Sequence, residues 1–522
     1  MAVVKLRKNF HQAKWDEPII FELSRPGERG ILIPEAGDEI EKEVGDGFSD
    51  IPSHMIRKEL PKLPEISQIR VLRHYLRLSQ ETLGVDLVSM EGQGTCTMKY
   101  SPKINEVFVR SPKVAELHPL QDEDTVQGAL EIMYKVDLML RELSGFDRFT
   151  FQPGGGSHAI YTMASIIYAY HKLHDNAYKD EIITTLLSHP SDAAAPKVKG
   201  FKVIDILPDP ETGFPDIEAF KAAVSERTAG MIICNPEDTE IFNPHIKEMT
   251  KMIHEVGGLC AYDQANANGT IGIVRAIDLG FDMGFYNLHK TFSSPHGGGG
   301  PGLGALGVKK ELEAFLPVPV VDYNEESGRY YLNYNLPHTI GKIREFYGVF
   351  PVIVRTYAWL MSLGEEGIKE VAKIAVLNNN YLMTRILKEV KGVGISFSKT
   401  KYRVSQARYT FKKLAEDTGV TVEDVARRLA DFGFHLWLSH HPWIIPEPFT
   451  IEPTESYSKD DLDEYVKALK TVAQEAYQNP EKVKNAPYQS VIHKITNTRM
   501  LEDPENWVPT WRIYLRKYGK KE

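Results

Sequence analysis

A histidine and a lysine stand a few residues before a glycine-rich run in the middle of this 522-residue chain. His289 and Lys290 follow an apolar stretch typical of a short strand, and residues 297–300 are all glycine. Because glycine lets a backbone come close to a ligand, the segment is typical of a binding loop at a strand end. A lysine there can form a Schiff base with an aldehyde cofactor once its surroundings lower its pKa. The alternative is an ordinary lysine at a solvated strand end.

Pyridoxal phosphate, as such an aldehyde, needs a lysine, a carboxylate for its pyridinium nitrogen and a cradle for its phosphate. Asp263 stands at the carboxyl end of an expected buried strand, 258–262, and precedes Lys290 by 27 residues. This gap accommodates one crossover and one return strand, so both side chains can reach the same edge of a parallel sheet. A helix N-cap is the alternative role for Asp263.

The expected phosphate cradle is a glycine-rich turn at residues 151–158, FQPGGGSH, before an apolar helical stretch at 159–170. Free backbone N–H groups and the helix dipole favour an anion at such a helix start. Ser157 is placed to donate a hydroxyl group, and His158 to lie against the cofactor ring. A triple glycine alone is more often a flexible turn. Cradle, carboxylate and lysine in this chain order together predict a pyridoxal phosphate site.

Two other motif interpretations are excluded. His296 and the glycines after it look like the oxyanion-hole segment of lipases and esterases, but that fold needs a Gly-x-Ser-x-Gly turn after a strand. The nearest candidate, residues 155–159, lacks the final glycine. The sequence also has no Gly-x4-Gly-Lys-Ser/Thr phosphate loop.

Residues 287–302, with Lys290 and the run that follows His296, resemble the lysine segment of the P-protein family of the glycine cleavage system. This family contains the pyridoxal-phosphate-dependent glycine decarboxylases, and the chain resembles the second, lysine-bearing subunit of the split form. The resemblance covers about residues 15–490. It implies fold-type I, an α/β fold with a mostly parallel sheet in a large domain and a smaller α+β C-terminal domain. Other stretches that agree with the family are 21–27, 95–103, 118–121, 375–378 and 451–455.

The resemblance also implies roles for individual residues. Lys290 would hold the cofactor, Asp263 would pair with its ring nitrogen, and both His189 and His158 would act beside it as catalytic residues. The remaining implied cofactor contacts are Gly156, Ser157, Asn266 and His289, and the segment with Thr97 and Lys99 would close over the pocket.

Five positions depart from the family pattern in segments that border its pocket: Ile160, Asp192, Glu240, Gln264 and Ser405. Asp192 and Glu240 add carboxyl groups, and extra negative charge disfavours an anionic substrate carboxylate unless a cation compensates it. We therefore expect weak glycine chemistry and leave open a different amino acid as the substrate.

The composition fits a cytoplasmic enzyme. A formal net charge of -9 shows no excess of basic residues for binding nucleic acid. The apolar runs are too short to cross a membrane. Three cysteines without CxxC spacing, Cys96, Cys234 and Cys260, are expected as reduced thiols, two of them in buried strands. No structural metal site is expected.

Four segments are expected along the chain. Residues 1–118 form an N-terminal arm with an amphipathic helix at 66–80, which suits burial against a partner or closure of a pocket. Residues 119–330 alternate helices with apolar strands and form the large domain. Residues 339–484 form the small domain, with helices at 364–390 and 421–432, and residues 485–522 form a C-terminal tail.

A histidine pair, His440 and His441, lies five residues beyond His435. The surrounding residues 436–445 are expected to form a β-strand, which places adjacent side chains on opposite faces. Structural or substrate-facing roles are therefore favoured over metal ligation.

The resemblance implies that an amino acid displaces Lys290 and loses carbon dioxide, and that the product is transferred to the lipoyl group of H-protein. It further implies a first P-protein subunit in a hetero-oligomer, with a homodimer as the alternative. Two other functions stay open: a related decarboxylase or transaminase for another amino acid, and a catalytically weak subunit that scaffolds a partner.

Overall fold

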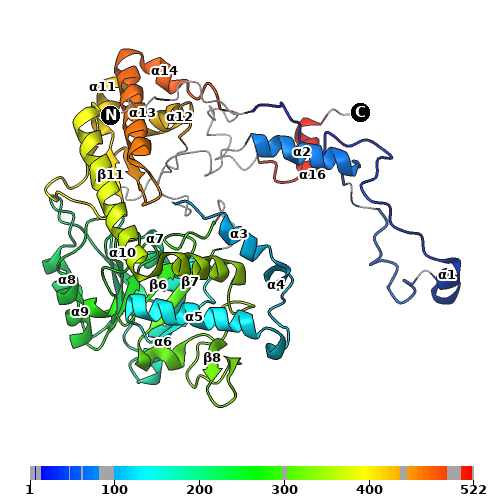
Figure 1. The fold of residues 1–522 in the computed structure, drawn as a ribbon, viewed down its shortest axis with the longest axis horizontal. Coiled ribbons are helices and arrows are strands. Elements are labelled where there is room, and N and C mark those ends of the chain that lie inside the picture. Colours follow the sequence, from blue (N-terminus) through cyan, green and yellow to red (C-terminus); the bar gives the residue numbers. More distant parts are fainter. Residues whose placement is uncertain are drawn as a thin grey trace. The chain divides into compact units, whose positions relative to one another are not determined.

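The computed structural model describes residue 6 and residues 13–45, 47–59, 61, 63–81, 99–296, 302–434, 444–490 and 507–519. The chain divides into two compact units, one formed by residues 1–8 and 85–486 and the other by residues 9–84 and 487–522. Figure 1 labels most of their helices and some of their strands. None of the described helices is both long enough and apolar enough to cross a membrane.

A seven-stranded sheet forms the centre of the larger unit, in the order β1-β7-β6-β5-β4-β2-β3. Strand β7 runs antiparallel to both of its neighbours, and the pairs among β6, β5, β4, β2 and β3 are parallel. The mostly parallel sheet expected from the sequence is therefore confirmed. The strands are β1 Arg148–Thr150, β2 Glu181–Thr185, β3 Lys202–Ile206, β4 Thr228–Cys234, β5 Leu259–Asp263, β6 Met283–Asn287 and β7 Gly304–Val308.

Helices cover both faces of this sheet because its central strands are apolar on both sides. In β4, Met231 and Ile233 belong to one apolar core, and Ala229 and Ile232 belong to the other. The first core lies under α5 Gln127–Ser144, α8 Ile217–Ala223 and α9 Ile246–Glu255; the second lies under α6 Gly156–Leu173 and α7 Pro190–Lys199. The result is a three-layer α/β/α arrangement.

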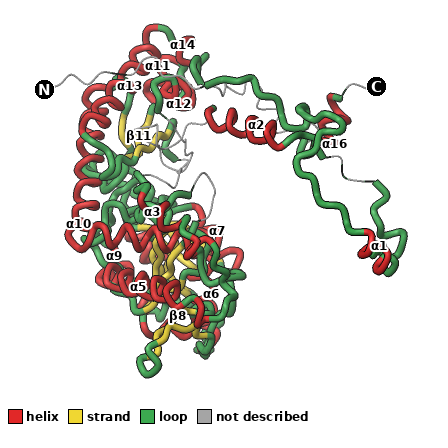
Figure 2. The backbone as a smooth tube through the Cα atoms, turned by 45° about the vertical axis from the view of Figure 1, so that its right-hand side comes forward, coloured by secondary structure: helices red, strands yellow, loops and turns green. Residues whose placement is uncertain are grey.

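Helix α10, Phe350–Glu389, joins this large sheet to a smaller one (Figures 1 and 2). Its first part contributes Val352 and Ile353 to the large core, and its last part contributes Leu382 and Ile386 to the small core. Gly364 interrupts the helical geometry at φ 64°. The helix expected at 364–390 is therefore only the second half of α10.

The smaller sheet has the order β10-β11-β12, with antiparallel pairs and helices packed against it. Helix α12 confirms the helix expected at 421–432. The elements of this part are β10 Gly394–Ile395, β11 Ala407–Thr410, α11 Lys412–Thr418, α12 Val422–Ala430, β12 Pro448–Ile451, α13 Lys459–Gln478 and α14 Pro480–Lys484. The remaining elements of the unit are α3 Ile104–Val109, α4 Pro112–Ala115, η1 Glu123–Thr125, η2 Ile277–Leu279, η3 Lys310–Phe315, β8 Val320–Asn324 and β9 Arg329–Asn333.

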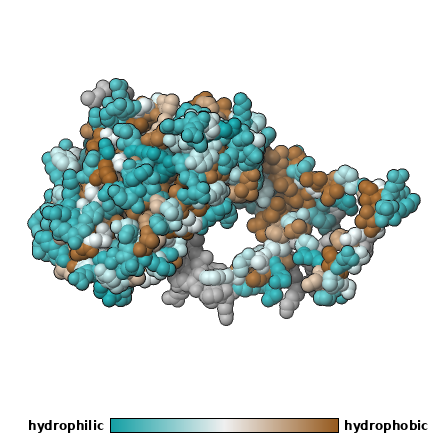
Figure 3. Space-filling model, turned by 90° about the horizontal axis from the view of Figure 1, so that it is seen from below, coloured by the Kyte–Doolittle hydropathy of each residue, from teal (hydrophilic) through white to brown (hydrophobic). Residues whose placement is uncertain are grey.

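The second unit contains α1 Asp38–Val44, α2 Gln68–Gln80 and α16 Trp511–Tyr518. Helix α2 confirms the amphipathic helix expected at 66–80. His74 is buried against Glu17, with 2.9 Å between Nδ1 and Oε1, whereas Leu72 and Leu76 are about half exposed. Figure 3 shows apolar side chains on the surface of this unit, on the right of the view. The burial of this apolar face against a partner stays a prediction.

Several expectations fall outside the described residues: Cys96, Thr97, the histidines 435, 440 and 441, and most of the strand expected at 436–445. Cys234 and Cys260 are buried free thiols in β4 and β5, as expected. The domain boundaries after residues 118, 330 and 484 stay predictions.

Candidate active site

The predicted site residues come from strands that end at one edge of the large sheet. Strands β2, β4, β5 and β6 are parallel, so the segments after their carboxyl ends lie along that edge. Asp263 ends β5, Lys290 follows the end of β6 by three residues, and the glycine-rich turn follows β1. Ligands of open α/β sheets bind at this edge.

Lys290 is half-buried on a compact turn between β6 and the glycine run. Its N–H donates to the Asn287 carbonyl at 3.0 Å, and the adjacent Thr291 Oγ1 accepts from the Ala267 N–H at 2.9 Å. The Lys290 backbone is therefore held to the end of its own strand and to the loop that follows Asp263.

Asp263 is 5% exposed, and its Oδ1 accepts from the Ala265 N–H at 2.9 Å. Asp192 and Cys234 lie beside it: one carboxyl oxygen of each aspartate and the Cys234 sulfur all lie within 4.8 Å of one another. Full burial, followed by charge repulsion from Asp263, raises the pKa of Asp192 well above its ordinary value. A raised pKa favours the neutral form of a carboxyl group buried beside another carboxyl group, so the extra negative charge expected at Asp192 stays a prediction.

The glycine-rich turn lies close to the ends of β6 and β7. A Cβ on Gly156 would lie 3.1 Å from Asn287 Nδ2, and a Cβ on Gly304 would lie 2.8 Å from the Gly155 carbonyl oxygen. Helix α6 begins at Gly156, and its first turn has exposed Ser157 and half-buried His158. His158 Nδ1 accepts from the Gly154 N–H at 3.1 Å, so this ring closes the turn.

Arg344 lies next to the turn and was missed by the sequence reasoning. Its Nη1 would be 3.2 Å from a Cβ on Gly154, and this atom is buried without a hydrogen-bond partner among the described residues. Burial, followed by the charge of Arg344, lowers the pKa of His158. A buried guanidinium nitrogen with unused donor capacity beside a helix start fits an anionic ligand group. Arg344 comes from an irregular segment, so neither periodicity nor spacing marks it.

The other histidines occupy different places. His189 is the exposed N-cap of α7, where its Nδ1 accepts from the Ser191 N–H at 3.2 Å. His289 is buried, and its Nδ1 accepts from the Leu303 N–H at 3.1 Å. Burial, then the charges of His296 and Lys290, lower the pKa of His289 to about 3, so this ring is neutral.

Asn266 and Asn268 hold a buried glutamate that the sequence reasoning did not assign to the site. Their Nδ2 atoms donate to Glu452 Oε1 at 2.7 and 2.8 Å. Ser405 Oγ lies 3.4 Å from the same oxygen and 3.1 Å from Glu240 Oε2. Two of the positions that depart from the family pattern, Glu240 and Ser405, therefore contact each other and reach Glu452. Burial, followed by repulsion from Glu452, raises the pKa of Glu240 to about 8.

The other two departures lie elsewhere. Ile160 is fully buried in the apolar core between α6 and the sheet. Gln264 is buried, and its Nε2 donates to Thr270 Oγ1 at 3.4 Å.

The segment that begins at Lys99 contacts the turn that carries Lys290. Its buried ammonium group donates to Glu455 Oε1 at 2.9 Å, and the neighbouring Tyr100 carbonyl accepts from Ser293 Oγ at 2.5 Å. Ser293 is on the Lys290 turn, so the segment that begins at Lys99 lies against that turn.

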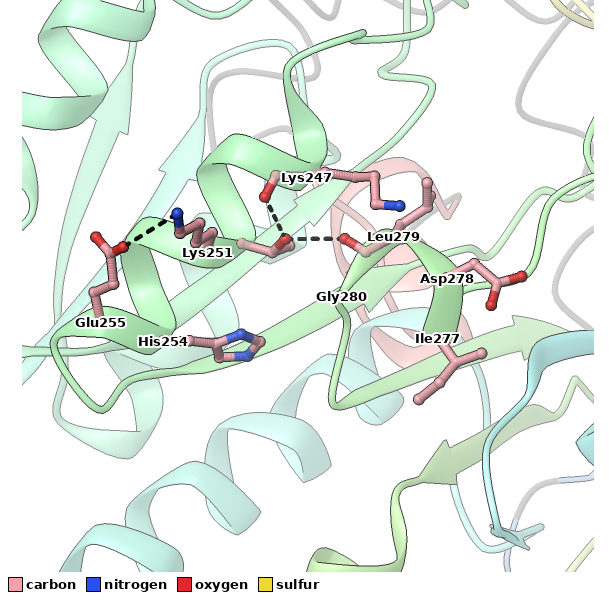
Figure 4. Close-up of a pocket in the computed structure, with 9 residues that line it drawn as sticks. Lys247, Lys251, His254, Glu255, Ile277, Asp278, Leu279 and Gly280 are labelled. Carbon is pink, nitrogen blue, oxygen red and sulfur yellow. Dashed lines mark hydrogen bonds and ion pairs between the residues drawn. The ribbon is translucent and has the colours of Figure 1, made fainter.

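A separate surface pocket lies between α9 and the short helix η2 (Figure 4). Thr250 Oγ1 donates there to the Leu279 carbonyl at 2.9 Å, and Lys251 pairs with Glu255 at 3.7 Å. None of the candidate site residues lines this pocket.

Two family descriptions match parts of the chain. "Aminotransferase class-V" matches residues 151–323, and "Glycine dehydrogenase, C-terminal domain" matches residues 371–495. Among solved structures, the glycine decarboxylase (P-protein) of the glycine cleavage system in inhibitor-bound form matches with a TM-score of 0.71 at 19% identity, covering 85% of this chain and 100% of that one. A sphingosine-1-phosphate lyase of Burkholderia pseudomallei matches with a TM-score of 0.59 at 13% identity, covering 82% of this chain and 95% of that one. The fold is therefore that of the fold-type I enzymes.

The curated relatives match nearly the whole chain. The probable glycine dehydrogenase (decarboxylating) subunit 2 of Pyrococcus furiosus is 47% identical over 513 residues, which cover 98% of this chain and 99% of that protein. The protein of the same description from Thermococcus kodakarensis is 46% identical over 505 residues, covering 97% and 98% of the two chains. This chain therefore belongs to the glycine dehydrogenase (decarboxylating) subunit 2 family.

Proposed function

We propose that this chain is the lysine-bearing, pyridoxal-phosphate-dependent subunit that decarboxylates glycine and passes the aminomethyl group to a lipoyl carrier. The observation that carries the proposal is the meeting of Lys290, Asp263 and the start of α6 at one edge of the sheet. The names of the relatives, glycine dehydrogenase (decarboxylating) subunit 2, support the substrate.

The residues at this edge fit the cofactor. We assign the aldehyde to Lys290, the ring nitrogen to Asp263, and the phosphate to the α6 start with Gly156 and Ser157. The unused donor Arg344 Nη1 near this start supports the phosphate assignment. The further contacts proposed are His158, His189, Asn266 and His289. When bound, pyridoxal phosphate supplies an electron sink for the electron pair released as the substrate carboxyl group leaves.

The chain's own groups would prepare the site for this chemistry. The buried side chains of Asp263 and His289 exclude water, which strengthens electrostatic contacts made there. Burial lowers the pKa of His289 to about 3, so this ring adds no positive charge beside Lys290.

The partners proposed are a first P-protein subunit, which the designation "subunit 2" of the relatives supports, and the lipoyl carrier H-protein. A hetero-oligomer would cover the apolar side chains that α2 exposes, such as Leu72 and Leu76. A homodimer is the alternative assembly. We also propose a cytoplasmic location.

A second candidate is the same cofactor chemistry on another amino acid. The Glu240–Ser405–Glu452 contacts favour it, because two of these three residues depart from the family pattern close to the Lys290 loop.

Borohydride reduction tests the cofactor assignment. The purified protein is mixed with pyridoxal phosphate, reduced with borohydride and digested. The reduced cofactor is then expected on the peptide that contains Lys290. Lys309→Ala is a matched control, since Lys309 pairs with Asp282 at 2.7 Å on another part of the sheet. Labelling of a different lysine, or no visible band with added cofactor, would contradict the assignment.

A further inference from the structure

Ser405 joins two buried carboxyl groups. Glu240 Oε2 accepts from the Ser405 N–H at 2.7 Å and from its hydroxyl at 3.1 Å, and the same hydroxyl lies 3.4 Å from Glu452 Oε1. Glu240, Ser405 and Glu452 are each less than 5% exposed. A serine hydroxyl has one proton to donate, so the hydrogen bond between these groups responds to which carboxyl group is ionised.

The two carboxylate oxygens of Glu452 differ in their hydrogen bonds. Oε1 accepts from the side-chain amides of Asn266 and Asn268, whereas Oε2 is buried and has no hydrogen-bond partner in the part of the chain that the structure describes. A carboxylate oxygen shielded from water with no donor is costly unless a cation or a proton occupies it. Glu452 is 1% exposed, so solvent does not supply that partner.

A short loop connects Glu452 to Lys290. Asn266 and Asn268 hold Glu452, and the N–H of Ala267 between them donates to Thr291, the residue after Lys290, at 2.9 Å. The positive charge of Lys290 is close enough to lower the pKa of Glu452, against the larger opposing effect of burial. The unpartnered carboxylate oxygen and the lysine are therefore positioned by the same few residues.

We propose that Glu452 takes the proton from the ammonium group of the incoming substrate, with Glu240 and Ser405 as positioning residues that set its proton affinity. The proposal rests on the proposed cofactor lysine. A substrate N–H bond breaks, its electron pair stays on nitrogen as the lone pair needed for attack, and the proton moves to Glu452 Oε2. The same proton passes to the amine of Lys290 when that amine is displaced, so no proton is gained or lost.

The charges around the cluster fix the expected pH dependence. Burial raises the pKa of Glu452, and the hydrogen bonds from Asn268 and Asn266 and the charges of Lys290 and Lys99 lower it. Burial and the charges of Glu452 and Asp238 raise the pKa of Glu240, next to which Arg408 is also buried. With a pKa of about 8, Glu240 is neutral at neutral pH and becomes negative above it. That new negative charge increases the proton affinity of Glu452, so proton removal from the amine should accelerate as the pH passes about 8.

Methylamine is a suitable probe, because it is a cation at neutral pH and needs neither a carboxylate contact nor decarboxylation. The holoenzyme is mixed with methylamine between pH 6 and pH 10, and the rate at which the visible spectrum of the cofactor changes is measured. Three variants are compared, Glu452→Gln, Glu240→Gln and Glu237→Gln, together with their cofactor content and melting temperature. Glu237 is the matched control, since it is 2% exposed and has a pKa of about 8 but contacts Thr185.

Glu452→Gln is expected to keep full cofactor content and to slow the change about 100-fold at pH 7, as loss of a general base does. This deficit should shrink as the pH approaches ~10, where solution supplies the unprotonated amine. Glu240→Gln should remove the acceleration near pH 8, and Glu237→Gln should retain it.

A wild-type rate in Glu452→Gln, or a deficit that is the same at every pH, overturns the proposal, as does an unchanged pH profile in Glu240→Gln. If the wild-type protein itself shows no Lys290-dependent band, the proposed cofactor site fails too. If Glu452→Gln has the normal cofactor band and reacts with methylamine at the wild-type rate, only the proposed proton transfer is overturned, and the cofactor assignment stands.

Discussion

Asp192 lies beside Asp263: one carboxyl oxygen of each and the Cys234 sulfur all lie within 4.8 Å of one another. Cys234 Sγ donates to Asp192 Oδ2 at 3.5 Å, and burial, followed by the charges of Asp263 and Asp192, raises the pKa of the thiol. The carboxyl group proposed to face the cofactor ring nitrogen thus lies beside two buried groups whose pKa values are raised.

Asp192→Asn is expected to change little at neutral pH, because the raised pKa of Asp192 favours its neutral form and an amide of the same size is also neutral. Spectral titration with glycine at pH 7 should give an affinity within about twofold of the wild type, since no charge is removed. An affinity for glycine about tenfold or more above that of the wild type would instead indicate an ionised Asp192 that repels the substrate carboxylate.

Arg344→Ala is expected to weaken the binding of pyridoxal phosphate about 10- to 100-fold, the usual worth of one charge-assisted hydrogen bond. Binding of pyridoxal, which lacks the phosphate, should stay unchanged. The pKa of His158 should rise, because the positive charge that opposes its protonation is gone, and NMR titration measures this.

The control for Arg344→Ala is Lys342→Ala, which removes an exposed positive charge two residues away. Equal losses in both variants, or an equal loss for pyridoxal, would count against a phosphate contact by Arg344.

Glu237→Gln is expected to stabilise the protein at alkaline pH. Burial raises the pKa of Glu237 to about 8 in the folded state, whereas the unfolded chain has an ordinary value near 4.3. Between these values the folded state binds more protons, so the wild type loses stability as the pH rises. Glutamine still accepts the hydrogen bond of Thr185 and carries no charge.

Melting temperatures at pH 5 and pH 9 test this, with exposed Glu366→Gln as the control. The gain of Glu237→Gln over the wild type should be larger at pH 9 by at least ~2 °C, the shift that about 1 kcal/mol produces in a domain of this size. A gain that does not depend on pH would mean that Glu237 is ionised throughout.

The parts of the site that the sequence predicted are those with a local pattern. Asp263 and Lys290 each follow a short apolar strand, and the glycine turn precedes a long apolar helix, so strand ends and a helix start could be read directly from the residues. The parallel order of β4, β5 and β6 then brings these ends together.

The parts that it could not predict depend on packing between distant segments. Glu452 reaches the site from the start of the segment after β12, and Arg344 from an irregular stretch before α10, so no spacing relates them to Lys290. The raised pKa of Asp192 depends on its burial, which the residue type does not reveal. Helix α10 begins at Phe350 rather than at Gly364, because the residues before this glycine are helical as well.

Exchange of labelled bicarbonate into the carboxyl group of glycine tests the central claim most directly. The protein is assayed with a first subunit and a lipoylated carrier, beside Lys290→Ala and the control Lys309→Ala. Exchange is expected in the wild type and in Lys309→Ala, accelerated by the carrier and abolished in Lys290→Ala. Exchange that survives in Lys290→Ala, or a cofactor spectrum that responds to another amino acid while glycine gives no exchange, would contradict this claim.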